Sequence, residues 1–275
     1  MGKHTSVSES SLTMSRSAAF LCSFRDVPPL SLHSPSPIDN SLTFWNPRLP
    51  FVPYYACASR WRNENDCDNV LNVLHPKYDA VKQYYPHYFH TRDRMGNMVY
   101  IERPAGVDVA KIKKNGISIK KLVWHYMYCV EYLWQRWSPK ETDRLTTILD
   151  LRGVSLFMVV GDVRKFIKMT IHMCSTHYPA RGHKLFIINC PMWFSQVWTW
   201  IKPMLNSAIE EKLKILTSGK KQVQALLEII DEDHLPEAYG GKETTPFGES
   251  KYDKEIRAWV VSVLEKQGVE MDSWV

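Results

Sequence analysis

Several familiar signatures are missing from this sequence of 275 residues. No apolar run approaches the ~18 residues that a membrane-spanning helix needs. None of the six cysteines forms a C-x-x-C pair, which argues against zinc ribbons and thioredoxin-like sites. The glycine-rich dinucleotide fingerprint, the P-loop and the serine elbow G-x-S-x-G are absent as well. These absences argue against the enzyme classes that depend on such motifs.

The remaining candidates for catalysis lack the partners that catalysis requires. Six residues separate Cys174 from Arg181, which is too many for the phosphate-wrapping loop of a cysteine phosphatase. Asp150 ends a predicted strand, where a catalytic acid could lie, but no base or nucleophile accompanies it. The sequence therefore predicts a protein that is not an enzyme and needs no cofactor.

The histidines do not predict a metal site. His172 and His177 are five residues apart and miss the shared helix face that metal ligands at i and i+4 use. His87 and His90 are three apart near a turn, and we expect them to serve structure. No metal is therefore predicted.

The composition is that of a folded protein with a sizeable core. Apolar residues make up 44% of the chain and charged residues 23%, enough for one large domain or two small ones. The 10 tryptophans suit a large core or an amphipathic surface. A net charge of +6 favours anionic surfaces such as phospholipid headgroups and is too mild to predict nucleic-acid binding. Cys129, Cys174 and Cys190 lie among apolar residues, so we expect buried thiols and a reducing, cytosolic setting.

Residues 1–55 are rich in serine and proline and show no helical or strand periodicity. We expect a disordered or non-homologous segment there. Two alternatives stay open. Residues 16–23 are similar to a weak signal or transit peptide. The start Met1-Gly2-Lys3-His4-Thr5-Ser6 fits the loose pattern for N-myristoylation.

From Tyr78 to Lys242, strand and helix patterns alternate. Short apolar or alternating runs predict strands at Met98–Arg103, Thr146–Leu151, Leu185–Asn189 and Leu213–Leu216. Helical spacing predicts helices at Ser118–Trp137, Val159–Thr176, Phe194–Lys202, Asn206–Lys212 and Lys220–Ile230. This order predicts an α/β fold with a mostly parallel sheet flanked by helices. A further amphipathic helix at Asp253–Lys266 could pack back on the domain or rest on a membrane.

Four motifs within residues 78–242 are more specific. The first is Tyr84-Tyr85-Pro86 with Asp93 and Gly96, and the second is Asp150-Leu151-Arg152-Gly153. The third is Tyr178-Pro179, followed by an apolar strand that ends in Asn189-Cys190-Pro191, and the fourth is Leu235-Pro236-Glu237-Ala238-Tyr239-Gly240-Gly241. In this order they resemble the CRAL-TRIO family of lipid-binding domains, most closely its secretory phosphatidylinositol/phosphatidylcholine-transfer branch.

The resemblance implies a floor of strands under an apolar pocket that a mobile helix covers. Phe194, Trp198, Ile201 and Leu205 would form this gate. Trp193 and Trp200 lie off the apolar stripe of the same helix. They either meet a partner or membrane, or pack on a neighbouring loop.

The resemblance also implies which residues hold the lipid headgroup. Lys212 falls at the position of a phosphoinositide-coordinating lysine, near Arg181. Tyr126, Tyr100 and Thr147 match a choline pocket, and Phe89 replaces a tyrosine there. Three polar positions are instead apolar, at Leu145, Ala180 and Ile209. This change could suit a less polar ligand such as a sterol.

These features divide the chain into residues 1–55, a remnant of an N-terminal helical lobe at 56–77, the lipid-binding domain at 78–242 and a C-terminal extension at 243–275. The short lobe is either a natural truncation or an error in the assigned gene start. We expect a cytoplasmic protein, peripheral at membranes, that binds one phosphatidylinositol, phosphatidylcholine or other hydrophobic molecule and transfers or presents it. Membrane contact would be transient, and no nucleic acid is expected. The alternative is a docking module of the same fold that moves no lipid.

Overall fold

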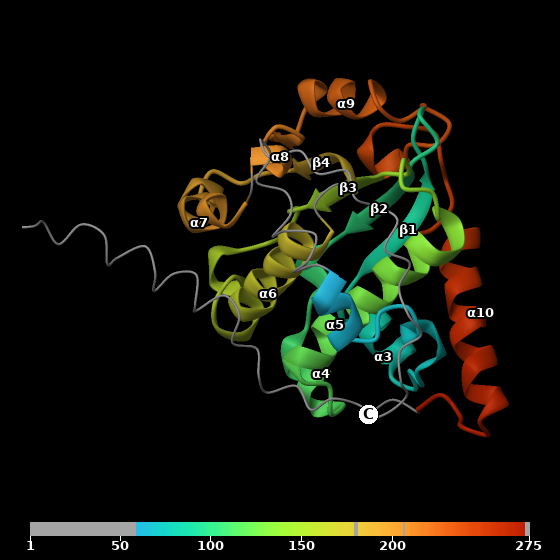
Figure 1. The fold of residues 1–275 in the computed structure, drawn as a ribbon. Coiled ribbons are helices and arrows are strands. Elements are labelled where there is room, and N and C mark those ends of the chain that lie inside the picture. Colours follow the sequence, from blue (N-terminus) through green and yellow to red (C-terminus); the bar gives the residue numbers. More distant parts are fainter. Residues whose placement is uncertain (1–58, 179–180, 206, 273–275) are drawn as a thin grey trace, which may run out of the picture. The chain divides into compact units, whose positions relative to one another are not determined.

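The structure is a computed structural model that describes residues 59–178, 181–205 and 207–272 (Figure 1). The predictions made for residues 1–55 and for Ala180 therefore concern positions outside the described residues. Residues 59–64, within the short helix expected near Ala56–Asn65, are helical. Among the described helices, none combines the length and apolar character required to cross a bilayer.

A five-stranded sheet organises the fold, in the order β1-β2-β3-β4-β5. The strands are β1 (His87–Arg92), β2 (Met98–Glu102), β3 (Leu145–Asp150), β4 (Gly182–Ile188) and β5 (Leu213–Ile215). β1 and β2 form an antiparallel hairpin, and every later pair is parallel. Parallel neighbours need helical crossovers, which explains the alternation in the sequence. The predicted mostly parallel α/β sheet is confirmed.

Helices cover both faces of this sheet. One face borders an apolar cavity and carries α5 (Ile119–Tyr132), α6 (Gly161–His177) and α7 (Phe194–Ile201). The other face is covered by α9 (Lys220–Leu227). On the α9 side, one core joins β2, β3 and β4 to α9 and the loop after it, through Val99, Ile101, Ile148, Phe186, Ile188, Leu226, Ile230 and Leu235. Successive strand residues point to opposite faces, so this core leaves the alternate residues free to line the hollow side.

Local signals set the helix boundaries. Ser118 caps α5 by accepting a hydrogen bond from the Lys121 backbone N–H at 3.2 Å, as expected for a serine N-cap. α5 continues into a π-helical segment at Leu133–Trp137. Tyr178 ends α6, because the following Pro179 disfavours helical backbone at the residue before it. The remaining helices are α3 (Tyr78–Tyr84), α4 (Val109–Lys114), α8 (Ser207–Glu210) and α10 (Lys251–Lys266).

The sequence motifs meet at the carboxyl end of the central strands. Asp150 Oδ1 accepts a hydrogen bond from Asn189 Nδ2 at 2.7 Å, and Asp150 Oδ2 accepts one from the Tyr239 hydroxyl at 3.1 Å. Arg152 donates its backbone N–H to the same carboxylate at 2.9 Å. Three motifs distant in sequence are therefore fastened to one buried carboxylate. Asp150 has a structural role, in agreement with the sequence argument against catalysis.

The C-terminal helix α10 packs back on the domain. Ile256, Val260 and Leu264 are buried in a core shared with α5 and the β1–β2 hairpin. Ser250 caps α10 by accepting from the Asp253 N–H at 3.0 Å. Of the two alternatives for this helix, packing on the domain is thus confirmed.

Three elements were not predicted. β1 reads His-Tyr-Phe-His-Thr-Arg, which is too polar to be recognised as a strand from its own sequence. It is a strand because it pairs with β2 along its length. α3 and α4 are only 7 and 6 residues long, shorter than a periodic pattern needs. Each is held by tertiary packing, through Val81 and Ile112, in a core with α5.

Candidate functional site

A cavity of about 440 Å³ lies between the sheet and helices α5, α6 and α7. This volume is within the range of pockets that hold one small ligand. Most of its wall is apolar, with contributions from Val130, Trp134, Val163, Phe166, Ile167, Ile171, Phe194, Val197 and Ile201. Such a wall offers burial to an apolar molecule and few polar groups to orient it.

Alternate residues of β3 and β4 form the floor. Leu145, Thr147 and Leu149 of β3 line the cavity, whereas Thr146 and Ile148 between them are buried in the opposite direction. Leu185 and Ile187 of β4 continue the floor. The alternation of side chains along a strand therefore decides which residues of these apolar runs face the cavity.

α7 covers the cavity, as the family resemblance implied for a gate. Phe194, Trp198 and Ile201 line the pocket, and Leu205 after the helix lines it too. Phe194 and Val197 pack on the floor residues Leu151 and Ile187. α7 meets the sheet through these apolar contacts, which carry no directional bonds to the strands. An apolar molecule could replace these contacts when it enters.

The two tryptophans off the gate stripe pack on neighbours. Trp193 lines the cavity and belongs to the apolar cluster around α7. The Arg164 guanidinium of α6 lies over the Trp200 ring at 4.9 Å, a cation–π distance. Both rings are therefore half-buried against the domain in this structure.

Two of the predicted headgroup residues are cations at the cavity wall. Lys212 precedes β5 and donates from Nζ to the Gly182 carbonyl oxygen at 2.7 Å. Arg181 precedes β4, donates to the Lys140 carbonyl oxygen at 2.6 Å and lies 4.7 Å over the Trp134 ring. The cavity thus has a basic end where β4 and β5 begin. An anionic headgroup would have to draw at least one of these side chains from its present partner.

The four predicted headgroup residues other than these cations do not lie together. Tyr126 and Thr147 line the cavity. Tyr100 lies behind Tyr126, with the two ring centroids 6.1 Å apart, and Phe89 lies behind Tyr100 at 5.1 Å. Tyr100 and Phe89 are buried in the core and do not line the cavity of this structure. A row of rings in edge-on and tilted contact therefore leads from the cavity wall to β1.

The structure adds an acidic wall residue that the sequence did not single out. Glu102 ends β2 and borders the cavity. Burial raises the pKa of Glu102 to about 7, because the carboxylate is withdrawn from water. The α6 wall residues were missed as well. The apolar spacing from Val163 to Cys174 marked a helix face, but the sequence did not show that the face borders a cavity.

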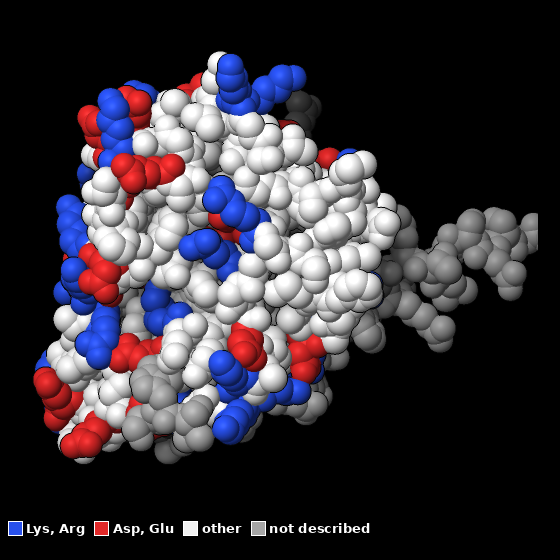
Figure 2. All heavy atoms as spheres, turned by 180° about the vertical axis from the view of Figure 1, so that it is seen from behind, with Lys and Arg blue, Asp and Glu red and all other residues white. Residues whose placement is uncertain are grey.

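Exposed apolar side chains occur next to the gate cluster. Phe157 and Val160 before α6 are 87% and 59% exposed, and Met192 before α7 is 98% exposed. Their neighbours Leu156, Val159 and Trp193 belong to the cluster that packs around α7. Figure 2 shows a broad uncharged surface on the side of the domain where α7 lies. Uncharged surface with protruding apolar side chains suits contact with another apolar phase.

Known proteins share this architecture. SEC14 cytosolic factor of Kluyveromyces lactis is 30% identical over 213 residues, which cover 74% of this chain and 70% of that protein. The phosphatidylinositol/phosphatidylcholine transfer protein SFH9 of Arabidopsis thaliana is 30% identical over 190 residues, 66% of this chain but only 32% of the plant protein. The crystal structure of Sfh5 aligns with a TM-score of 0.54 at 21% identity, covering 76% of each chain. The last likeness concerns the fold alone.

The family match runs over residues 82–241, from α3 through the final Gly-Gly motif. It includes the sheet, the cavity floor and the α7 gate. The resemblance inferred from the four motifs is confirmed, and the chain belongs to the CRAL/TRIO domain family.

Proposed function

We propose that the protein binds one lipid in the cavity beneath α7 and transfers or presents it between membranes. The observation that carries this proposal is the apolar cavity between the β3–β4 floor and the α7 gate. Hydrophobic burial supplies about 25 cal/mol per Å² of apolar ligand surface. The name of the similar Arabidopsis thaliana protein, a phosphatidylinositol/phosphatidylcholine transfer protein, agrees with this activity.

The basic end of the cavity suits a phosphate-bearing headgroup. Lys212 and Arg181 border the cavity there, and Tyr126 and Thr147 add hydroxyls along the wall. Tyr100 and Phe89 would support Tyr126 from behind. The apolar side chains of Leu145 and Ile209 also border the cavity, so a less polar lipid would fit the same space.

Lipid exchange requires contact with a membrane, and we propose that the protein acts in the cytoplasm and binds membranes peripherally. Phe157, Val160 and Met192 would enter the interface beside α7. The net charge of +6 would favour an anionic leaflet. The residues before 59 and the extension after 242 flank this lipid-binding unit, which we assign to residues 78–242.

Mass spectrometry of lipids extracted from the purified protein tests the pocket. We expect a defined lipid class at a constant ratio to protein. Leu149→Trp should fill the floor and strongly lower the bound lipid, whereas Leu149→Met conserves volume and should retain it. A protein that is empty after purification and after incubation with vesicles would contradict the proposal.

Transfer between vesicles tests the headgroup contact. Lys212→Ala should reduce phosphatidylinositol transfer tenfold or more, since a charge-assisted hydrogen bond contributes roughly 1.5–3 kcal/mol. Lys214→Ala is the matched control, because Lys214 pairs with Glu228 at 3.0 Å and does not line the cavity. Vesicle binding without transfer by the wild-type protein would favour a docking module instead.

A further inference from the structure

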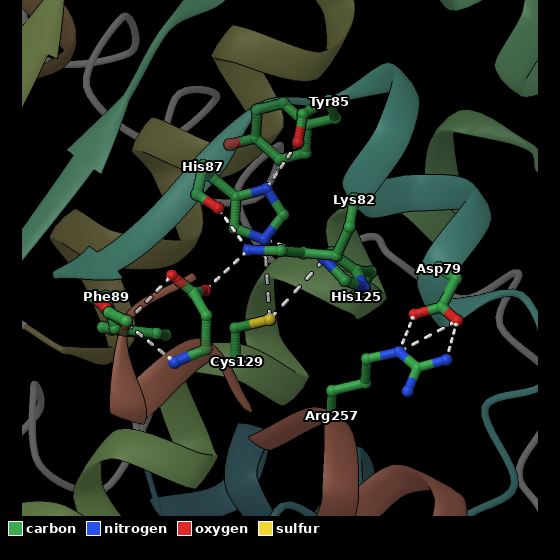
Figure 3. A network of polar contacts seen from close by, with 10 residues as sticks. Asp79, Lys82, Tyr85, His87, Phe89, His125, Cys129 and Arg257 are labelled. Atoms are coloured by element: carbon green, nitrogen blue, oxygen red, sulfur yellow. Dashed lines mark hydrogen bonds and ion pairs between the residues drawn. The ribbon is translucent and has the colours of Figure 1, made fainter. Parts of the chain in front are cut away.

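Three metal-ligating atoms converge beneath the start of β1, outside the cavity (Figure 3). His87 comes from β1, and His125 and Cys129 lie one turn apart on α5. The two histidine Nε2 atoms are 3.0 Å apart, and Cys129 Sγ lies 3.5 Å from His125 Nε2 and 3.8 Å from His87 Nε2. The three residues are 1%, 0% and 3% exposed.

These separations match those of ligands around a tetrahedral ion. Zn²⁺ lies about 2.0–2.1 Å from a histidine nitrogen and about 2.3 Å from a cysteine sulfur. An ion at these lengths from the three atoms of His87, His125 and Cys129 would have ligand–metal–ligand angles of about 95° to 120°, close to tetrahedral.

The outer contacts orient both imidazoles toward the same point. His87 Nδ1 lies 2.6 Å from the Tyr85 carbonyl oxygen. A carbonyl only accepts, so Nδ1 carries the proton and Nε2 presents its lone pair to the cluster. His125 Nδ1 meets His75 Nε2 at 2.7 Å. A carbonyl partner on the second ring nitrogen, as His87 has, is typical of metal-binding histidines.

A cation with a compensated charge lies beside the cluster. The nearest cation, Lys82, pairs with Asp253 at 2.9 Å. Its charge is thereby compensated, and its ammonium group also donates to the His87 carbonyl oxygen.

A hydrogen-bonded arrangement without metal is also chemically complete. In it His75 donates to His125 Nδ1, and His125 Nε2 donates to the lone pair of His87. In this hydrogen-bonded arrangement Cys129 is a weak sulfur partner, 3.5 Å from His125 Nε2 and 3.8 Å from His87 Nε2. A metal ion would use all three atoms.

We propose that His87, His125 and Cys129 bind a zinc ion that fastens β1 to α5. Among the described His, Cys, Asp and Glu residues, no fourth ligand completes the cluster, so water would take that position. Binding would release the Cys129 proton, since a thiolate is the ligand. The site stands behind the cavity wall, one residue from Tyr126, and is independent of the lipid.

Metal analysis of the full-length protein, incubated with Zn²⁺ and then desalted, tests the site. We expect about one zinc per chain, bound to two imidazoles and one thiolate. Cys129→Ser and His125→Gln should lose it. Cys190→Ser should retain it, because Cys190 contacts the Ile187 carbonyl oxygen in another part of the domain. A zinc-free wild-type protein, or equal zinc in Cys129→Ser, would overturn the proposal.

Two measurements on the wild-type protein test the zinc site without variants, which would lose zinc simply by failing to fold. Removal of metal with a chelator should lower the melting temperature, and zinc should restore it. Cobalt(II) should give the visible spectrum of a tetrahedral ion with a sulfur-to-metal charge-transfer band. Absence of both effects would contradict the site, whatever the variants do. Copper recovered in place of zinc would overturn the zinc assignment.

Discussion

The Arg62 guanidinium donates to the Glu131 carboxylate at 2.6 Å, and the Glu131 side chain is fully buried. Arg62 belongs to the short helical stretch at 59–64, and Glu131 to α5. Gln135 and Tyr178 donate to the same carboxylate at 3.0 and 2.5 Å. The described stretch at 59–69 is thereby bound into the domain.

Removing this guanidinium should destabilise the fold. Arg62→Met leaves the Glu131 charge without its cation, which costs about 3 kcal/mol for a buried pair. Urea unfolding measures the loss, and Arg60→Met is the control because Arg60 is exposed. Equal stability of the two variants would show that the stretch contributes little to the domain.

The final Gly-Gly motif is set by close backbone packing. A Cβ at Gly241 would lie 1.9 Å from the Leu235 carbonyl oxygen and 2.5 Å from the Leu235 Cβ. Gly241→Ala should therefore lower stability by more than about 3 kcal/mol or prevent folding. At Gly182 an added Cβ meets nothing within 4 Å, so Gly182→Ala should change the melting temperature little. A thermal melt that does not separate the variants would contradict this packing.

The lowered pKa of the Asp93 carboxyl predicts that the folded protein loses stability in acid. Burial alone would raise its pKa, but hydrogen bonds from Thr146, Asn97 and His183 outweigh burial and lower the pKa below the ordinary 3.8. The unfolded chain then binds a proton more readily than the folded chain. The stabilisation from Asp93 is present above pH 3.8 and is lost as the pH falls through its lower folded value.

Asp93→Asn should lower the free energy of unfolding at pH 7 by about 2 kcal/mol and flatten its decline below pH 4. Chemical unfolding at several pH values measures both effects. The exposed Asp233→Asn is the control. A variant that keeps the acid decline of the wild type would assign that decline to other carboxylates.

The raised pKa of the Glu102 carboxyl predicts the opposite pH dependence of stability. Burial raises its pKa from 4.5 to about 7, so the folded protein holds the proton more tightly than the unfolded chain. Its favourable contribution is complete below pH 4.5 and is lost as the pH rises through about 7. This loss amounts to at most about 3 kcal/mol.

Melting temperatures at pH 5 and 8 check this expectation. The wild type should lose several degrees more than Glu102→Gln, whose amide does not ionise. Glu237→Gln, an exposed carboxyl outside the cavity, should behave as the wild type. Parallel curves for the wild type and Glu102→Gln would show that water or a cation solvates the carboxylate.

The sequence predicted the sheet better than the hairpin that completes it. The runs at β2, β3, β4 and β5 are short and apolar or alternating, so local chemistry identifies them. β1 has only Phe89 as a strongly apolar member, and pairing with β2 supplies what its own sequence lacks. The register of a strand pair depends on both strands, so the sequence of one strand alone does not determine it.

The sequence likewise predicted some residues of the candidate site and missed others. The gate stripe from Phe194 to Ile201 followed from helical spacing, and each of its predicted members lines the cavity. The family resemblance implied that Tyr100 and Phe89 hold the headgroup, but their side chains are buried in the core. The His125–Cys129 pair has the i, i+4 spacing of metal ligands on a helix, yet His87 joins it only through the fold.

The outermost strand next to the cavity, β5, has three residues and carries Lys214 at its centre. An unpaired strand edge can recruit a strand from another molecule, and a short edge with a central lysine resists such recruitment. Departure of α7 from the floor would leave apolar surface beside this edge. The charge and brevity of β5 would then limit self-association through this strand edge.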